Sequence, residues 1–513
     1  MSLTRESGVN CPGDALKSSK LPRLAAISYF YDFYYSVIKD GMFLWQIERL
    51  HDQYGPIVRI TPREIHIKDS SFYHMIYAGN HRRTDTDQYF VQFAGAPYSM
   101  LGTSDHHAHQ CRRKVLSRYF SKRAIARAQP LIQETIEAAL KNLKQACEQG
   151  TIVNLRQLSA ALTAETICHY SYGHTFSFLE NGSGNILSKS VQTLSSFANL
   201  LRFLPFNLSR LKNVPFGFVE RLFPGAAAIL RLHKRISADA LKVLRGGTSY
   251  GNPSIFHALS DPSLPAGERT LARLEDEGFV ILSAGTETTP HALSVTMFYL
   301  LSDKVLLSQL QDEVRGVMPL HATIPPLSDL ENLPLLRACI NEGLRLSIGT
   351  LSRHPRIAPD TVLEYEGYTI PAGVSILFNS LSLAILLAIL SSAADFGRLT
   401  FRQTPVGQAQ YFVHMDPEIY PNPRTFNPWR WLEASKQGVH LESMLVPFTK
   451  GSRQCLGIHL AYAEIYLVVA NLINRVDMHL VDTNLDHVSP HRDRILVQPR
   501  DQSGVKVIVT KIL

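Results

Sequence analysis

The sequence predicts a single, mainly α-helical unit with a small β-rich lobe. Helical hydrophobic spacing dominates from His106 to about Met318, and short strand-like patterns lie before and after it. No Ser/Gly-rich linker, charge block or internal repeat divides the 513 residues, of which 45% are hydrophobic and 19% charged. A chain of this size and composition can bury one large core. Residues 26–513 are therefore expected to form one domain.

The first elements form a polar tail, a helix and two short strands. Residues 1–25 contain no apolar run of about 20 residues, so we expect a tail without a membrane anchor or signal peptide. Phe43–Tyr54 has helical spacing and stops at Gly55-Pro56. Short strands are expected at Ile57–Ile60 and Glu64–Lys68.

The later elements include one unusual helical region and two more strand regions. Residues 199–230 are broken by three prolines and rich in Leu and Phe. This pattern is typical of a gating or membrane-facing region, and equally of an ordinary helix–loop–helix with one buried face. Strand patterns return at Val362–Ile370 and Val505–Ile512 and complete the β-rich lobe.

Charge and cysteine content narrow the class of protein. The net charge is +8, from 52 basic and 44 acidic residues, and the basic residues are scattered. This distribution fits a docking face for an acidic partner or an anionic membrane, or plain solvated charge, and it does not single out nucleic acid. The six cysteines are far apart without CxxC spacing, so a disulfide framework is not expected.

The segment Pro447–Gly457 carries the strongest chemical signal. Cys455 directly precedes a long apolar helical stretch, Ile458 to about Val476. A thiolate that ligates iron must stay deprotonated, and the N-terminus of a helix favours negative charge. Gly451 and Gly457 would let the backbone turn tightly and approach a flat ligand.

The pattern Phe448-x-x-Gly451-x-Arg453-x-Cys455-x-Gly457 resembles the haem-binding signature of the cytochrome P-450 family at every defined position. The resemblance implies haem b with Cys455 as the axial thiolate and metal ligand. It also implies that Phe448 covers the sulfur side of the ring and that Arg453 binds a propionate. The resemblance covers roughly residues 40–510 except one segment, and it implies the mostly helical cytochrome P-450 fold. Several stretches look like filamentous-fungal members that act on terpenoids and related secondary metabolites.

A polar turn interrupts the long helical pattern Leu271–Leu301. A Thr-rich polar turn is unfavourable inside a helix, and this one reads Ala284-Gly285-Thr286-Glu287-Thr288-Thr289. A purely structural explanation is a Ser/Thr patch whose hydroxyls bond back to the helix carbonyls. The segment is also similar to the family's oxygen-binding groove. That similarity implies that Gly285 leaves space over the distal face, and that Glu287 and Thr288 deliver protons to bound dioxygen.

Glu342 and Arg345 lie three residues apart on a predicted helix that begins near Pro334, so they share a face. An exposed pair of this kind would contribute under about 1 kcal/mol. In context the pair resembles the family's E-x-x-R motif, which binds a later arginine. Arg430 is the match, although Trp429 stands where the family has an acid. The implied role is structural: the network holds the segment before the cysteine loop.

Further basic residues resemble the family's propionate-binding positions. His109-x-x-x-Arg113 implies that both side chains bind propionates, although basic helices with histidine are common. Arg356, at the end of Ser352–Arg356, resembles another arginine with the same role.

Residues 374–403 interrupt the resemblance. A structureless insertion of 30 residues (403 − 374 + 1) is uncommon within a compact domain, and its apolar core would form an exposed patch. It would interrupt a strand hairpin. Thirty codons keep the reading frame, and the ends are compatible with splice sites. We therefore predict a retained intron, with a genuine membrane-dipping insertion as the alternative.

The resemblance implies a monooxygenase that inserts one oxygen atom from O2 into a small apolar substrate. Electrons would come from NADPH through a separate NADPH–cytochrome P-450 reductase. The implied location is the cytosolic face of the endoplasmic reticulum membrane, with peripheral membrane contact and no nucleic acid partner. Two alternatives stay open: a haem-thiolate isomerase or dehydratase of the same fold, and a non-catalytic chain disrupted by 374–403. Substrate contacts are expected from Asp87–Leu101, 199–223, Phe279–Gly285, Ile348–Leu351 and Val497–Arg500.

Overall fold

The computed structural model describes residues 23–180, 184–203, 221, 224–247, 254–320, 324–372 and 404–513. The predicted insertion 374–403 and nearly all of the predicted tail lie outside these residues. Of the predicted gating region 199–230, residues 204–220 and 222–223 are also outside them.

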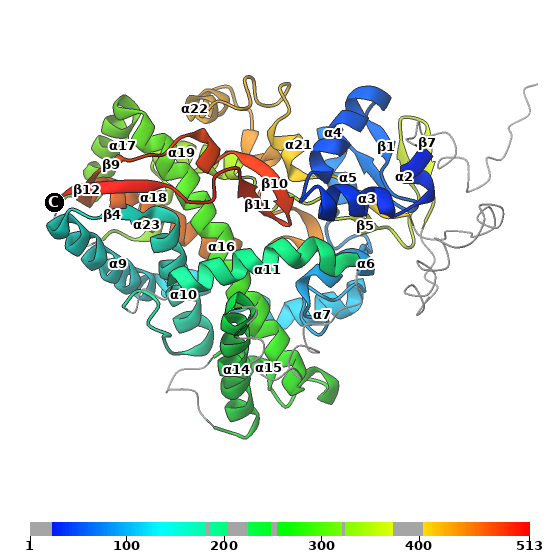
Figure 1. Ribbon diagram of the computed structural model, residues 1–513, viewed down its shortest axis with the longest axis horizontal. Helices are drawn as coiled ribbons and strands as arrows, with labels where there is room; N and C mark the ends of the chain where they lie inside the picture. Colours follow the sequence, from blue (N-terminus) through cyan, green and yellow to red (C-terminus); the bar gives the residue numbers. More distant parts are fainter. Residues whose placement is uncertain are drawn as a thin grey trace, which may run out of the picture.

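A bundle of long helices forms the larger part of the molecule (Figure 1). Helix α16 (Leu271–Ser302) runs through its middle and packs against α10 (Leu155–Tyr172), α19 (Pro334–Ser347) and α23 (Ile458–Arg475). The helix starts at Thr270, whose hydroxyl accepts the Arg273 N–H at 3.3 Å. Its second half is buried almost completely, so this helix lies at the centre of the main hydrophobic core.

The remaining helices surround this bundle. The longer ones are α4 (Phe43–Tyr54), α7 (His106–Ser117), α9 (Gln129–Gln149), α11 (Gly184–Phe203), α14 (Pro224–Leu244) and α17 (Lys304–Val317). The shorter ones are α2 (Arg23–Ile27), α3 (Phe30–Phe33), α5 (Tyr73–Ile76), α6 (Gln88–Val91), α8 (Lys122–Arg127), α15 (Ile255–Leu259), α18 (Leu327–Glu331), α21 (Gln410–His414) and α22 (Trp429–Lys436).

Four small sheets complete the described fold. The five-stranded sheet has the order β1 (Ile57–Arg59), β2 (Ile65–Ile67), β8 (Val406–Gly407), β5 (Arg356–Ile357) and β3 (Asp85–Thr86). A three-stranded sheet has the order β4 (Ile152–Asn154), β12 (Lys506–Ile512) and β9 (Val476–Leu480). The two hairpins are β6 (Leu363–Tyr365) with β7 (Tyr368–Ile370), and β10 (Pro490–Arg494) with β11 (Leu496–Pro499).

One sequence-based expectation about the sheets is wrong. Strand β7 pairs with β6, whereas β8 pairs with β2 and β5, so the two strands that flank residues 374–403 belong to different sheets. The described strands on either side of the segment therefore do not form a hairpin with each other.

The mainly helical fold with a small β-rich lobe agrees with the sequence prediction. None of the helices in the described part of the chain combines the length and the apolarity needed to cross a lipid bilayer.

Candidate active site

The cysteine loop is built by two backbone constraints. The Cys455 N–H donates to the Phe448 carbonyl at 2.9 Å, which closes the loop before α23. Gly451 has φ +78°, and a Cβ there would lie 2.1 Å from the Ala78 carbonyl oxygen. Only glycine tolerates both conditions, as the sequence pattern predicts. The Phe448 ring packs against Tyr462, with 5.2 Å between ring centroids.

The Cys455 thiol is accessible and yet enclosed by protein. Its side chain has an exposed surface, and burial among the surrounding protein atoms raises the pKa of the thiol. The Gly457 N–H and the Arg113 charge act in the opposite direction and favour the thiolate. No heavy atom lies within 4 Å of where a Gly457 Cβ would be. The backbone beside the thiol is therefore open to a flat ligand.

Helix α16 presents an accessible stripe in an otherwise buried region. Val280, Ala284 and Thr288 follow each other at four-residue spacing, and all three are partly or fully exposed. The Thr288 hydroxyl donates to the Ala284 carbonyl at 2.9 Å. This contact is the one expected of a Ser/Thr patch bonded back to the helix carbonyls, which was one of the two explanations of this segment. A Cβ at Gly285 would meet Ile167 of α10 at an ordinary 3.7 Å. The structure therefore offers no steric requirement for glycine at this position.

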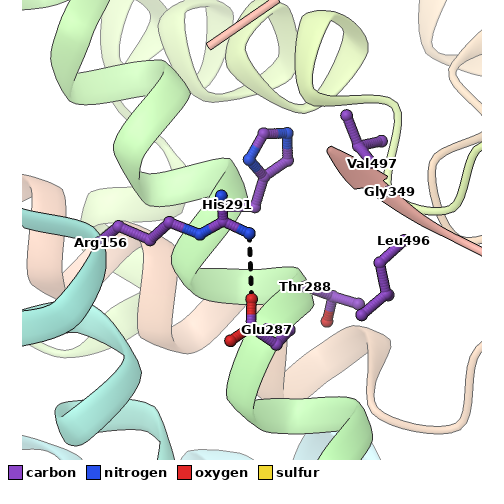
Figure 2. A pocket seen from close by; sticks show the side chains of 7 residues that line it. All are labelled: Arg156, Glu287, Thr288, His291, Gly349, Leu496 and Val497. Carbon is purple, nitrogen blue, oxygen red and sulfur yellow. Dashed lines mark hydrogen bonds and ion pairs between the residues drawn. The ribbon is translucent and has the colours of Figure 1, made fainter. Parts of the chain in front are cut away.

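Glu287 and Thr288 point to different partners. The Glu287 side chain is buried, and its Oε2 accepts a hydrogen bond from Arg156 Nη2 at 3.0 Å (Figure 2). Arg156 comes from the first turn of α10, and Figure 2 shows it crossing the front of α16 to reach the carboxylate. Sequence reasoning missed Arg156, because the contact joins residues 131 positions apart and no local pattern marks it.

Four basic side chains lie together near the cysteine loop. Arg113 Nη1 donates to the Gln454 carbonyl at 2.7 Å, and Arg453 Nη1 donates to the Thr103 carbonyl at 2.6 Å. Arg356 Nη1 donates to the Thr86 hydroxyl at 3.2 Å. The Nδ1 atom of buried His109 has no hydrogen-bond partner in the described structure. We call His109, Arg113, Arg356 and Arg453 the basic cluster.

The basic cluster contains charge that the protein does not neutralise by direct contact. Burial and the neighbouring arginines lower the pKa of His109 to about 2. Burial and then Arg356 lower the pKa of Arg453 to about 9. Within the described residues, no carboxylate forms an ion pair with any of the three arginines. Buried cations normally have an anionic partner, so this cluster fits a ligand with carboxylates, such as the two propionates of haem.

A second arginine cluster is centred on a buried carboxylate of the chain itself. Arg345 makes two parallel hydrogen bonds to the Glu342 carboxylate, at 2.8 and 2.9 Å, and both side chains are 0% exposed. Arg430 Nε donates to the same carboxylate at 3.2 Å. Trp431 Nε1 donates to it at 3.0 Å, a contact that sequence reasoning did not foresee. We call Glu342, Arg345, Arg430 and Trp431 the acid-centred cluster.

The acid-centred cluster also joins separate segments of the chain. Arg345 donates to the His414 and Pro423 carbonyls at 2.8 and 2.6 Å. The Asn427 N–H donates to Glu342 at 3.0 Å. Trp429, which stands where the related pattern has an acid, is 43% exposed and is not one of these contacts. The cluster therefore ties α19 to the segment that leads to the cysteine loop.

Comparisons with known proteins show the family of the chain. The profile of the Cytochrome P-450 family matches residues 33–385 and 402–507, and so passes over residues 386–401. Conidiogenone synthase of Penicillium rubens is 42% identical over 96% of this chain and 93% of its own length. The cytochrome P-450 monooxygenase TRI4 of Trichoderma arundinaceum is 38% identical over 94% of this chain and 88% of its own length.

A third relative, the cytochrome P-450 monooxygenase astB of Aspergillus terreus, is 36% identical over 94% of this chain and 90% of its own length. The identity extends over almost the whole chain, and the members of the family are haem-thiolate enzymes with haem b as cofactor. The chain belongs to the cytochrome P-450 family and is a monooxygenase of that family.

Proposed function

We propose that this monooxygenase inserts one oxygen atom into an apolar, terpenoid-type secondary metabolite, with Cys455 as the thiolate ligand of haem iron. The reaction balances as R–H + O2 + 2 electrons + 2 protons giving R–OH + H2O. The observation that carries the proposal is the enclosed but accessible Cys455 thiol beside the basic cluster. When bound, the haem supplies the dioxygen-activating chemistry.

The residues around the thiol would hold the cofactor from two sides. Arg113 and the Gly457 N–H favour the thiolate form of Cys455, which is the form that binds iron. Phe448 would lie beside the sulfur. His109, Arg113, Arg356 and Arg453 would hold the propionates through charge-assisted hydrogen bonds.

Proton delivery is assigned to helix α16. Thr288 lies on the accessible stripe, and its hydroxyl can turn from the Ala284 carbonyl toward an acceptor beside the stripe. Glu287, one residue away, would resupply the proton. The ion pair with Arg156 would fix the position of the Glu287 carboxylate.

A separate NADPH-dependent reductase is the proposed electron donor. Exposed basic side chains are Lys114 on α7, Arg118 directly after it, and Arg123 and Arg127 on α8. The hydrogen bond from Arg113 to the Gln454 carbonyl joins α7 to the cysteine loop. This basic face therefore suits an acidic flavoprotein near the ligand side of the site. Charge reversal by Arg118→Glu should raise the KM for the reductase at low salt and have less effect at high salt.

Peripheral contact with the endoplasmic reticulum membrane is proposed for the N-terminal helices. Leu24, Ile27 and Phe30 on α2 and α3 are each more than 60% exposed, at 65%, 64% and 61%. An apolar group of this kind suits the interfacial region of a bilayer. Co-sedimentation of the chain with phosphatidylcholine vesicles, reduced in the variant L24S/I27S/F30S, would support this location.

Residues 374–403 are proposed to derive from a retained intron. The family profile passes over 386–401, which lie inside this segment. The flanking strands β7 and β8 each pair within their own sheets, so both sheets can form without an intervening strand. Transcript sequencing tests the idea: a spliced message without these codons supports it, and a message that retains them contradicts it.

Reconstitution decides between this function and its alternatives. Purified chain, haem, a fungal P-450 reductase, NADPH and terpenoid candidates should give a product that contains one atom from labelled dioxygen. Product formation without reductase and dioxygen would indicate an isomerase or dehydratase instead. A chain that binds no haem would indicate the non-catalytic alternative.

A further inference from the structure

Two buried histidines bind each other in the β-rich lobe. His51 lies on α4 and is 4% exposed, and His66 lies on β2 and is 0% exposed. The His51 Nε2 and His66 Nδ1 atoms are 2.7 Å apart. Both rings also pack edge-on against Phe412 of α21, with 5.7 and 5.1 Å between ring centroids. Neither histidine belongs to the candidate active site.

The partners of the pair fix the position of every ring hydrogen. The Ala409 N–H donates to His66 Nε2 at 3.1 Å, so that nitrogen carries no hydrogen. The neutral His66 ring therefore has its hydrogen on Nδ1 and donates it to His51 Nε2. The His51 Nδ1–H in turn donates to the Gly55 carbonyl at 2.8 Å. All four ring nitrogens are used, and both rings are neutral.

One added proton does not fit this arrangement. A hydrogen on His51 Nε2 would point at the hydrogen on His66 Nδ1. If the His66 hydrogen moved to Nε2, it would point at the Ala409 N–H, which cannot accept it. Protonation therefore breaks either the contact between the two rings or the contact with Ala409. Because a buried donor without an acceptor is unfavourable, a proton favours separation of the segments that the pair joins.

The charges around the pair also affect its protonation. They come from three elements: Asp52 on α4, Lys68 after β2, and Arg353 after α19 together with its partner Glu64. The segment 406–413 adds only the phenol of Tyr411. Burial lowers the pKa of His51 to about 4. Burial, and then the charges of His51 and Arg353, lower the pKa of His66 well below its usual value.

Short contacts connect the pair to the cysteine loop. Gln408, which precedes the residue bound to His66, donates its N–H to the Tyr77 hydroxyl at 3.1 Å. The same hydroxyl donates to the Gln408 carbonyl at 2.7 Å. Next to Tyr77, the Ala78 carbonyl accepts the Ser452 N–H of the cysteine loop at 3.0 Å. The segment that His66 holds therefore supports the residues on which the cysteine loop rests.

We propose that the His51–His66 pair is an acid-sensitive joint, which fastens α4 to the segment supporting the cysteine loop and weakens haem retention when acid opens it. An open joint exposes both histidines to water, where the pKa of a histidine is about 6.5. Between pH 6.5 and about 4 the open joint binds protons that the closed joint does not. The closed joint therefore has its full stability above about pH 6.5 and loses it as the pH falls.

Hydrogen exchange of the Ala409 amide in the haem-loaded protein tests the joint, because this N–H binds His66 directly. Correction for the intrinsic exchange rate at each pH gives the opening constant. Each histidine that the open joint exposes should raise this constant about 25-fold from pH 7 to pH 5. His51→Gln keeps a donor and an acceptor but does not titrate, so its rise should be about 25-fold smaller than that of the wild type.

Haem loss, followed by the decay of the Soret absorption, provides the second readout. It should accelerate more between pH 7 and pH 5 in the wild type than in His51→Gln. His74→Gln is the matched control, because His74 is an exposed histidine on nearby α5. This control should behave as the wild type in both measurements.

An equal rise of the Ala409 opening constant in the wild type and in His51→Gln would overturn the joint. A smaller rise in His51→Gln, with haem loss unchanged from the wild type, would overturn the link to the cysteine loop. If His51→Gln does not fold, the wild type alone decides. Its Ala409 amide must then lose protection toward pH 5 relative to the amide of Ile465, a buried residue of α23, and constant relative protection contradicts the proposal.

Discussion

The acid-centred cluster and the basic cluster use the same kind of side chain for opposite purposes. In the first, Glu342 accepts hydrogen bonds from both Arg345 and Arg430, so a carboxylate of the chain pairs with two buried arginines. In the second, Arg356 and Arg453 donate to carbonyl and hydroxyl oxygens, and no carboxylate of the described residues pairs with either. The first cluster has its anion within the chain, whereas the second fits an anionic ligand.

A carboxylate partner within the chain distinguishes structural arginines from ligand-binding ones. Removing one partner of a buried ion pair leaves the other charge unpaired, so the acid-centred cluster should be needed in the haem-free and haem-loaded protein alike. The basic cluster should matter mainly when the cofactor is bound.

The largest effect is expected from Glu342→Gln. The change leaves two buried arginines without their carboxylate, and it should lower the free energy of unfolding by about 3–5 kcal/mol. Urea unfolding should show this loss with and without haem. Glu331→Gln is the control: Glu331 pairs with Lys122, whose side chain is 69% exposed, so the loss should stay below about 1 kcal/mol. Equal losses in the two variants would contradict the account.

An intermediate effect is expected from pH at His414, beside the acid-centred cluster. Burial, and then Arg345, lower the pKa of His414 to about 3, against about 6.5 in an unfolded chain. Between these values the unfolded chain binds a proton that the folded chain does not. Acidification below pH 6.5 therefore lowers the free energy of unfolding by about 1.4 kcal/mol per pH unit for this residue.

The variant His414→Gln isolates that contribution. Glutamine can still accept the Val446 N–H, which His414 Nε2 accepts at 2.9 Å, but it does not titrate. From pH 7 to pH 5 the wild type should therefore lose about 2 kcal/mol more of its free energy of unfolding than the variant does. Urea titrations at both pH values measure it, and parallel curves would show that His414 does not contribute.

The smallest effect is expected from His109→Leu in the basic cluster. Because His109 Nδ1 lacks a partner, the haem-free variant should be as stable as the wild type or slightly more stable. The haem-loaded variant should lose its cofactor about five- to tenfold faster, since one hydrogen bond to a propionate is removed. Haem transfer to apomyoglobin measures this rate. Destabilisation of the haem-free protein would instead assign His109 a structural role.

Local patterns in the sequence were sufficient for the helices and for much of the site. Phe43–Tyr54 was predicted with the bounds that α4 has, and the predicted helix Leu271–Leu301 ends one residue before α16 does. The Glu342–Arg345 contact follows from three-residue spacing on one helix. The need for Gly451 follows from its tight turn. These features depend on neighbouring residues, which a sequence displays directly.

Contacts between distant segments could not be predicted in the same way. Arg156 meets Glu287 only because α10 packs across α16, and Trp431 meets Glu342 only because α22 packs on α19. Likewise, β7 and β8 are close in the family pattern but pair in different sheets.

The most direct test of the central claim is the absorption spectrum of the purified, dithionite-reduced protein under carbon monoxide, compared with Cys455→His. The account predicts a strongly red-shifted Soret band in the wild type, because a cysteine thiolate binds the iron, and no such band in the variant. A wild type that binds haem without this band, or a variant that retains it, would contradict ligation by Cys455.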